Sequence, residues 1–190
     1  MIIVLISGKA GVGKDTFAYH LIHELNRLGR DCSKVPFAEA LKDVAKKDFN
    51  WDGNKDDKGR VLLQDIGKIG RKYFQRIWSR KTMMKISALE KNEFVKDSRV
   101  YIVPDWRFPD ELAETTEFYP TALVYKVRII APDRESLRGC PAYEDESENS
   151  LPEYNTLFYD KIIDNSGDYN QLNIVARDVA KYLIDITEKE

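Results

Sequence analysis

A glycine-rich turn near the start of the chain has the residue types of a phosphate-binding loop. It reads GKAGVGKDT over residues 8–16 and nearly fits the pattern GxxxxGK(S/T). Glycines let the backbone wrap a phosphate chain without Cβ clashes, and a helix starting after the loop adds positive potential there. Lys14 would neutralise the β- and γ-phosphates of a nucleotide. The predicted ATP-binding residues are Gly8, Ala10, Gly11, Val12, Gly13, Lys14, Asp15 and Thr16.

Asp15 departs from this pattern because it stands where a hydroxyl residue is usual. At pH 7 a carboxylate repels a phosphate and has no proton to donate to it. The residue is acceptable there if it meets Mg²⁺ directly or through water, since Mg²⁺ often keeps several waters. Thr16, one position later, can donate its hydroxyl to a phosphate. Asp15 and Thr16 are therefore predicted to serve a magnesium–phosphate shell.

A second pair of candidate residues ends a strand pattern in VYIVPDWRFPDE, residues 100–111. An aspartate at a strand end, here Asp105, is what Mg²⁺-ATP sites use to hold the metal shell. Arg107, two residues later, is expected at the same strand end and could bind a phosphate through two parallel hydrogen bonds. The structural alternative is that Arg107 pairs with Asp105 or Asp110.

The elements that must position these residues alternate between strand and helix. This alternation predicts βαβ units and a parallel sheet with helices on both faces, with ligands bound at the carboxyl ends of the strands. A polar turn is expected at 50–59, and Gly67 and Gly70 are expected to break the helical stretch that follows it. Strands are predicted at 2–6, 32–35, 100–103, 122–130 and 161–163, and helices at 15–28, 39–47, most of 60–96 and 169–186.

Length and composition indicate one soluble globular domain over residues 1–190. A net charge of −2 gives no global attraction to nucleic acid or to a membrane, so neither is expected as a partner. Two cysteines, Cys32 and Cys140, lie far apart and in no CxxC pattern, which suits a reducing compartment. The apolar run at 2–6 is too short for a signal peptide or a membrane span, and a cytoplasmic location is expected.

Two short strings resemble GTPase motifs. NKDD at 54–57 fits NKxD, and DNSG at 164–167 fits DxxG. Their order is the reverse of the GTPase order, and NKDD lies in a polar turn rather than after a buried strand. Both strings are therefore interpreted as solvated turn residues.

Longer strings of the chain resemble the phage and bacterial deoxynucleoside monophosphate kinases, which belong to the phosphate-loop kinases. The resemblance rests on GKxxxGKDT at 8–16, and it continues in the same order to residue 167. Within that family Asp15 is a normal variant of the loop. The other matching strings are FAEALKDVA, RVLLQDIGKIGRKYFQRIW, PDWRFPDE, DESENSLPEY and YDKIIDNSG.

The chain departs from the family at two points. Pro104 precedes the strand-end aspartate where a smaller or polar residue is usual, and no histidine precedes the pair Ser147-Glu148. The resemblance implies a three-layer α/β fold with a five-stranded parallel sheet, a small lid and an acceptor-binding helical region. It also implies transfer of phosphate from ATP to a (deoxy)nucleoside monophosphate with Mg²⁺, with Asp15, Thr16 and Asp105 serving the metal.

The acceptor-binding helical insert is expected at about 39–96. Residues 66–89 hold seven basic residues and no acidic one, which could provide cations for a phosphate or, alternatively, a solvated helix face or a nucleic-acid patch. Trp78 or Phe37 could stack on a base, and Gln64 could read its polar edge. The predicted substrate-binding residues are Phe37, Lys42, Gln64, Arg71, Trp78, Arg107 and Glu148.

The lid is expected at about 132–153. Arg134 and Arg138 have helical i, i+4 spacing and would lie on one face. In the resembling kinases, arginines here close over ATP, so the predicted catalytic residues are Lys14, Arg107, Arg134 and Arg138. The structural alternative is a surface helix in which Arg134 pairs with an adjacent acid.

Three other functions stay open from the sequence. The acceptor could be another small molecule, such as dephospho-coenzyme A or phosphomevalonate. The chain could instead be a non-catalytic ATP-binding module that uses its basic run to bind nucleic acid. A GTPase switch is the third alternative, and a homodimer is compatible with all of them.

Overall fold

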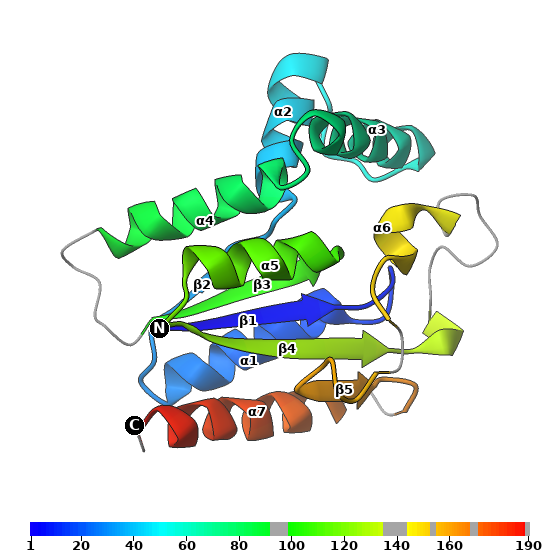
Figure 1. Ribbon diagram of the computed structural model, residues 1–190. Coiled ribbons are helices and arrows are strands. Elements are labelled where there is room, and N and C mark those ends of the chain that lie inside the picture. Colours follow the sequence, from blue (N-terminus) through cyan, green and yellow to red (C-terminus); the bar gives the residue numbers. More distant parts are fainter. Residues whose placement is uncertain (92–98, 135–143, 153–154, 168–170, 189–190) are drawn as a thin grey trace.

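The computed structural model describes residues 1–91, 99–134, 144–152, 155–167 and 171–188. The strands of this part form one parallel five-stranded sheet in the order β2-β3-β1-β4-β5 (Figure 1). The strands are β1 (Ile2–Ser7), β2 (Cys32–Lys34), β3 (Val100–Trp106), β4 (Leu123–Ile130) and β5 (Lys161–Asp164).

The central strand β1 is buried along its whole length, as expected for a parallel strand covered on both faces. In register, Val4 lies opposite Ile102 of β3 and Tyr125 of β4. The predicted fold class, an α/β sheet of five parallel strands with helices on both faces, is confirmed.

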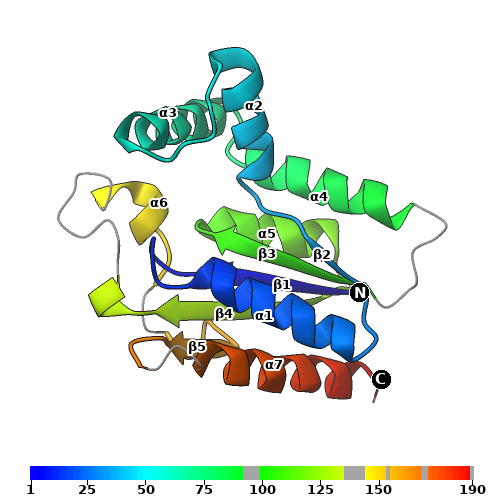
Figure 2. The same cartoon turned by 180° about the vertical axis from the view of Figure 1, so that it is seen from behind.

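Helices cover the two faces of the sheet (Figures 1 and 2). One face packs against α1 (Lys14–Arg27) and α7 (Gln171–Thr187), and the other against α4 (Ile77–Glu90) and α5 (Pro109–Phe118). The first layer buries Val4 against residues such as Phe17 and Leu172. The second buries Leu5 against Met83 and Ile86, among others.

Helices α2 (Glu39–Phe49) and α3 (Asp57–Tyr73) stand away from the sheet (Figure 1). They have a small core of their own, to which α4 contributes Trp78; the other members are Leu41, Ala45 and Ile66. Two short elements, η1 (Pro132–Arg134) and α6 (Glu146–Asn149), lie within the region expected as a lid. No described helix combines the length and the apolar character needed to cross a membrane.

The prediction that Gly67 and Gly70 break the helix is wrong. Both lie inside α3, which begins within the predicted polar turn because the Asp56 side chain accepts a hydrogen bond from the Gly59 N–H at 2.7 Å. A Cβ on Gly70 would lie 2.6 Å from a ring carbon of Trp78, so glycine here permits close packing rather than a bend. The interruption comes instead at 74–76, between α3 and α4.

Strand β3 also continues past Pro104 and Asp105 instead of ending there. The proline costs no ladder bond to β2, because that pairing stops at Lys34 opposite Ile102. On the β1 side the register shifts between Leu5 and Ser7, so that Asp105 lies at an irregular point of the pairing.

Candidate active site

A cavity of about 380 Å³ opens where the glycine-rich loop meets α2, α3 and α6. It brings together most of the predicted site residues from segments far apart in sequence. Those that line it are Ala10, Gly11, Lys14, Asp15, Phe37, Lys42, Gln64, Arg71, Trp78, Asp105, Arg107 and Glu148. The other predicted loop residues, Gly8, Val12, Gly13 and Thr16, are not among the lining residues of the described chain.

The loop is held in shape from β4 and from the segment after β5. Gly8 has φ +148°, and a Cβ there would lie 2.5 Å from the Ile129 carbonyl oxygen, so only glycine fits. The buried Asn165 side chain donates to the Val12 carbonyl at 3.0 Å. The interpretation of DNSG as solvated turn residues is therefore wrong for Asn165, which positions the loop.

Lys14 is buried, and its Nζ donates to the carbonyl oxygens of Gly8 at 2.6 Å and Lys9 at 2.7 Å. Burial, with the nearby charge of Arg107, lowers the pKa of Lys14 to about 7. An incoming phosphate would favour the charged ammonium form. Lys14 is therefore placed to become charged and to bind an anion in the loop.

Asp15 faces outward beside the cavity and forms an ion pair with Lys34 of β2 at 2.6 Å. Partial burial opposes its ionisation, but the Lys34 hydrogen bond and charge hold the pKa of Asp15 below its usual value. The carboxylate is thus ionised, as a magnesium ligand must be. Lys34 was not predicted, because nothing in the sequence connects a short edge strand to the loop.

Asp105 accepts hydrogen bonds from the backbone N–H groups of Phe37 at 2.8 Å and Ala38 at 3.0 Å. It therefore holds the segment that leads into α2. A carboxylate has about four lone-pair sites, so these two bonds leave capacity for a metal-bound water. Asp15 and Asp105 together offer the oxygen ligands that Mg²⁺ takes.

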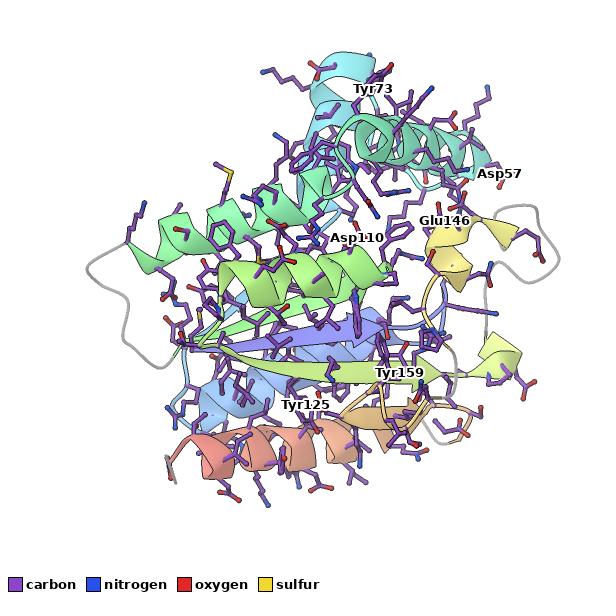
Figure 3. All side chains as sticks on the ribbon, viewed as in Figure 1. Asp57, Tyr73, Asp110, Tyr125, Glu146 and Tyr159 are labelled. Atoms are coloured by element: carbon purple, nitrogen blue, oxygen red, sulfur yellow. The ribbon has the colours of Figure 1, made fainter. Side chains whose placement is uncertain are left out.

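Arg107 and Glu148 form an ion pair at the edge of the loop. Arg107 also donates to the Ser147 carbonyl at 2.8 Å, and the other Glu148 oxygen accepts the Ala10 N–H at 2.9 Å. Among the described residues, neither Asp105 nor Asp110 forms an ion pair with Arg107, so that structural alternative is wrong. Figure 3 shows α6, which carries Glu146, at the same end of the sheet as the first turn of α5, which carries Asp110.

Glu111 is a cavity residue that the sequence reasoning missed. One of its oxygens accepts the N–H groups of Arg107 at 2.8 Å and Phe108 at 3.1 Å, which caps α5. Burial raises the pKa of Glu111 to about 8, so the group carries a proton in most molecules at pH 7. The sequence feature that could have revealed Glu111 is its position as the third residue of a helix that starts with Pro109.

Aromatic and cationic side chains share the wall formed by α3, α4 and the segment before α5. The Arg71 guanidinium lies 4.1 Å from the centre of the Phe108 ring, and Trp78 donates its ring N–H to the Gly67 carbonyl at 3.2 Å. Phe37 is almost fully buried in the sheet core, so little of its ring is open to a ligand.

Most of the basic run at 66–89 is neutralised by acids of other elements. Lys68 pairs with Asp145 at 2.6 Å, and Lys85 pairs with Glu39 of α2 at 2.6 Å. Arg76 and Arg80 both pair with the buried Glu114 of α5. These ion pairs between elements account for most of the basic run. Of its seven residues, only Arg71 is among the lining residues of the main cavity in the described chain.

Instead, the cavity gathers Lys42, Lys55 and Arg60, which, like Lys14 and Arg71, form no ion pair within the described ranges. Burial and repulsion from Lys42 lower the pKa of Lys55, and Arg60 adds to this repulsion. The sequence reasoning missed Lys55, which belongs to the NKDD string, and Arg60. Arg60 has the helical spacing to Gln64, Gly67 and Arg71 that could have revealed a common face.

The predicted lid arginines are not tested. Arg134 ends η1, and Arg138 lies outside the described residues. The lid therefore stays a prediction.

No protein-family model and no curated protein matches the chain. Solved structures do. A gluconokinase from Sinorhizobium meliloti 1021 is 11% identical with a TM-score of 0.54, covering 98% of this chain and 95% of that one. The APS kinase CysC of Mycobacterium tuberculosis, solved with AMPPNP and APS, is 14% identical with a TM-score of 0.51, covering 98% and 97%.

The chain has the fold of the P-loop kinases. A sugar kinase from Janibacter sp. HTCC2649 is also similar, at 15% identity, a TM-score of 0.50 and coverage of 93% and 92%. In this P-loop kinase fold the glycine-rich loop follows β1 and opens α1, as it does here. Identities this low establish the fold alone, so the narrower resemblance to deoxynucleoside monophosphate kinases belongs to the proposal below.

Proposed function

We propose that the protein is an ATP-dependent kinase that transfers the γ-phosphoryl group to a (deoxy)nucleoside monophosphate. The observation that carries this proposal is that one cavity joins the phosphate loop and Lys14 to a wall of aromatic and cationic side chains. A phosphate donor and a phosphorylated acceptor with an aromatic base need these two surfaces face to face.

On the donor side, the loop N–H groups and Lys14 hold the phosphates of ATP. Mg²⁺ would be held by Asp15, Thr16 and Asp105, directly or through water, and would neutralise charge on the β- and γ-phosphates. The carboxylates of Asp15 and Asp105 line the cavity, and oxygen ligands of this kind suit Mg²⁺.

On the acceptor side, Arg71 and Arg107 bind the monophosphate, and Lys42, Lys55 and Arg60 add positive charge. Trp78, with 8% of its surface exposed against 2% for Phe37, is the aromatic residue more open to the base, and Gln64 reads a polar edge of the base. The acceptor phosphate is already anionic at pH 7, so transfer requires no protein base. Positioning and charge stabilisation are sufficient.

Arg107 and the predicted lid residues Arg134 and Arg138 stabilise the transferring group. An arginine in this role contributes about 10³–10⁵ in rate. Closure of the lid would also exclude water, which otherwise accepts the phosphate.

The lining residues favour this acceptor over a polyol. An uncharged polyol needs no cations, whereas Lys42, Lys55, Arg60, Arg71 and Arg107 line the cavity and suit an acceptor that carries a phosphate. The solved relatives include a gluconokinase and an APS kinase, so acceptors differ widely across this fold. The ion pairs that neutralise the basic run count against the nucleic-acid-binding module.

An acceptor panel tests the proposal. ADP formation from Mg-ATP is measured with each ribo- and deoxynucleoside monophosphate, and with dephospho-coenzyme A, phosphomevalonate, APS and gluconate. We expect stimulation by one or more nucleoside monophosphates, lost in Lys14→Ala. Stimulation only by an acceptor other than a nucleoside monophosphate would show that the acceptor assignment is wrong.

A further inference from the structure

Glu148 places a carboxylate on the phosphate loop itself. One of its oxygens accepts the Ala10 N–H at 2.9 Å, and the other pairs with Arg107. The side chain is buried, with 7% of the residue exposed, so this contact is shielded from water. The Glu148 carboxylate thus uses a backbone N–H of the loop, as a bound anion would.

The neighbouring cations are engaged in the same way. Arg107 donates to the Ser147 carbonyl at 2.8 Å as well as to Glu148. Lys14 donates to the carbonyls of Gly8 and Lys9 inside the loop. The Ala10 N–H and the two cations Lys14 and Arg107 thus all have partners within the protein.

We propose that Glu148 is an internal anion that holds the phosphate loop and Arg107, and that a nucleotide displaces it on binding. This inference rests on the proposed function and describes how that same site is controlled. Displacement frees Arg107 to contact a phosphate group, so the arginine becomes available only when nucleotide is present.

Two physical arguments support displacement. The Ala10 N–H has one hydrogen to donate, so while it serves Glu148 it cannot also donate to a phosphate in the loop. A carboxylate held beside that phosphate would also meet a like charge in a shielded cavity, where repulsion is strong. The nucleotide must therefore compete with Glu148, and the competition lowers its apparent affinity.

Helix α6, which carries Glu148, is linked to α3 through the residue at its N-terminus. The Asp145 side chain caps it by accepting the Ser147 N–H at 3.0 Å, and Lys68 of α3 pairs with Asp145 at 2.6 Å. Movement of Glu148 away from the loop thus acts on a segment that also contacts the acceptor helices. Glu148 is a positioning residue in this account, because it acts through Arg107 and the loop.

The test is the affinity of the full chain for ADP, measured by calorimetry without any acceptor. Glu148→Gln keeps the shape of the side chain and removes its charge, so we expect ADP to bind about tenfold more tightly than to wild type. Glu146→Gln is the matched control, because it removes one negative charge from an exposed site on the same short helix. We expect it to change the dissociation constant by no more than about twofold.

A second variant covers the case in which Glu148→Gln does not fold. Glu148→Asp keeps the charge but withdraws it by one methylene, and it should also tighten ADP binding. Amide hydrogen exchange at Ala10 in the nucleotide-free protein gives an independent readout. Both variants should exchange faster there than wild type, and Glu146→Gln should not.

The outcomes separate the two proposals. Equal or weaker ADP binding by Glu148→Gln, with normal binding by wild type, overturns the inference and leaves the kinase proposal intact. Absence of ADP binding by wild type and variants alike overturns the kinase proposal, and the inference with it. If Glu148→Gln and Glu146→Gln tighten ADP binding to the same extent, the effect comes from net charge alone, and the inference is overturned.

Discussion

The Asp105 carboxylate accepts the backbone N–H of Phe37 at 2.8 Å, which ties the end of β3 to the segment entering α2. A second bond, from the Ala38 N–H at 3.0 Å, completes this tie. The residue proposed to serve the metal shell thus also holds the segment that enters α2. The proposed donor and acceptor sides of the cavity are therefore connected through this side chain.

Replacing Asp105 should therefore affect stability as well as activity. Asp105→Ala leaves two backbone donors without their partner, which should lower the unfolding free energy by about 1–3 kcal/mol and abolish turnover. Asp105→Asn keeps one accepting oxygen, so it should lose turnover with a smaller loss of stability. Urea denaturation and an ADP-release assay measure the two effects. An unfolding free energy of Asp105→Ala equal to wild type would contradict this role.

Nucleotide binding should take up a proton at Lys14. Its pKa of about 7 leaves the amine mostly neutral at pH 8, and a bound phosphate favours the ammonium form. Calorimetry of ADP binding at pH 8, in two buffers of different ionisation enthalpy, should show uptake approaching about one proton per site. The uptake should be smaller at pH 6, where Lys14 is already charged. Binding at pH 8 without any proton exchange would show that Lys14 is charged before the nucleotide arrives.

Stability should carry a pH dependence that comes from Glu111. Its pKa is raised to about 8, so between about pH 5 and 8 the folded chain keeps a proton that the unfolded chain has lost. This difference makes stability fall as pH rises through that window. Glu111→Gln cannot ionise, so its urea midpoint should fall less than that of wild type between pH 5.5 and 8. Parallel declines in the two proteins would rule out Glu111 as the source.

Arg60 should contribute to acceptor binding. It faces the cavity from the first turn of α3, whereas Lys58 on the same turn is exposed. Arg60→Gln should raise the KM for the nucleoside monophosphate by about 10- to 100-fold, with a smaller effect on the KM for ATP. Lys58→Gln, with the same change in charge, should leave both KM values near wild type. Equal effects of the two variants would assign the result to net charge.

The shape of the glycine-rich loop and its place at the cavity could be predicted well from the sequence. The apolar run that becomes β1, the glycines and Lys14 are consecutive, so local pattern alone fixes strand, loop and helix start. The parallel sheet could also be predicted, because strand and helix patterns alternate clearly along the sequence. Asp105 and Arg107 were placed at the cavity for the same reason: they directly follow a buried strand pattern.

The wall formed by α3 and α4 was harder to predict because its contacts come from packing between distant segments. Gly67 and Gly70 looked like helix breaks, but Gly70 is a point of close approach to Trp78. The ion pairs that neutralise the basic run reach acids on α2, α5 and the segment before α6, which spacing along one helix does not reveal. Glu111 was missed because its special environment results from burial in the folded chain.

The most direct test of the central claim is transfer of label from [γ-³²P]ATP to a nucleoside monophosphate in the presence of Mg²⁺. The account predicts a labelled nucleoside diphosphate, formed by wild type and lost in Lys14→Ala that retains its fold. Release of labelled inorganic phosphate alone, with no labelled diphosphate for any base or sugar, would contradict it.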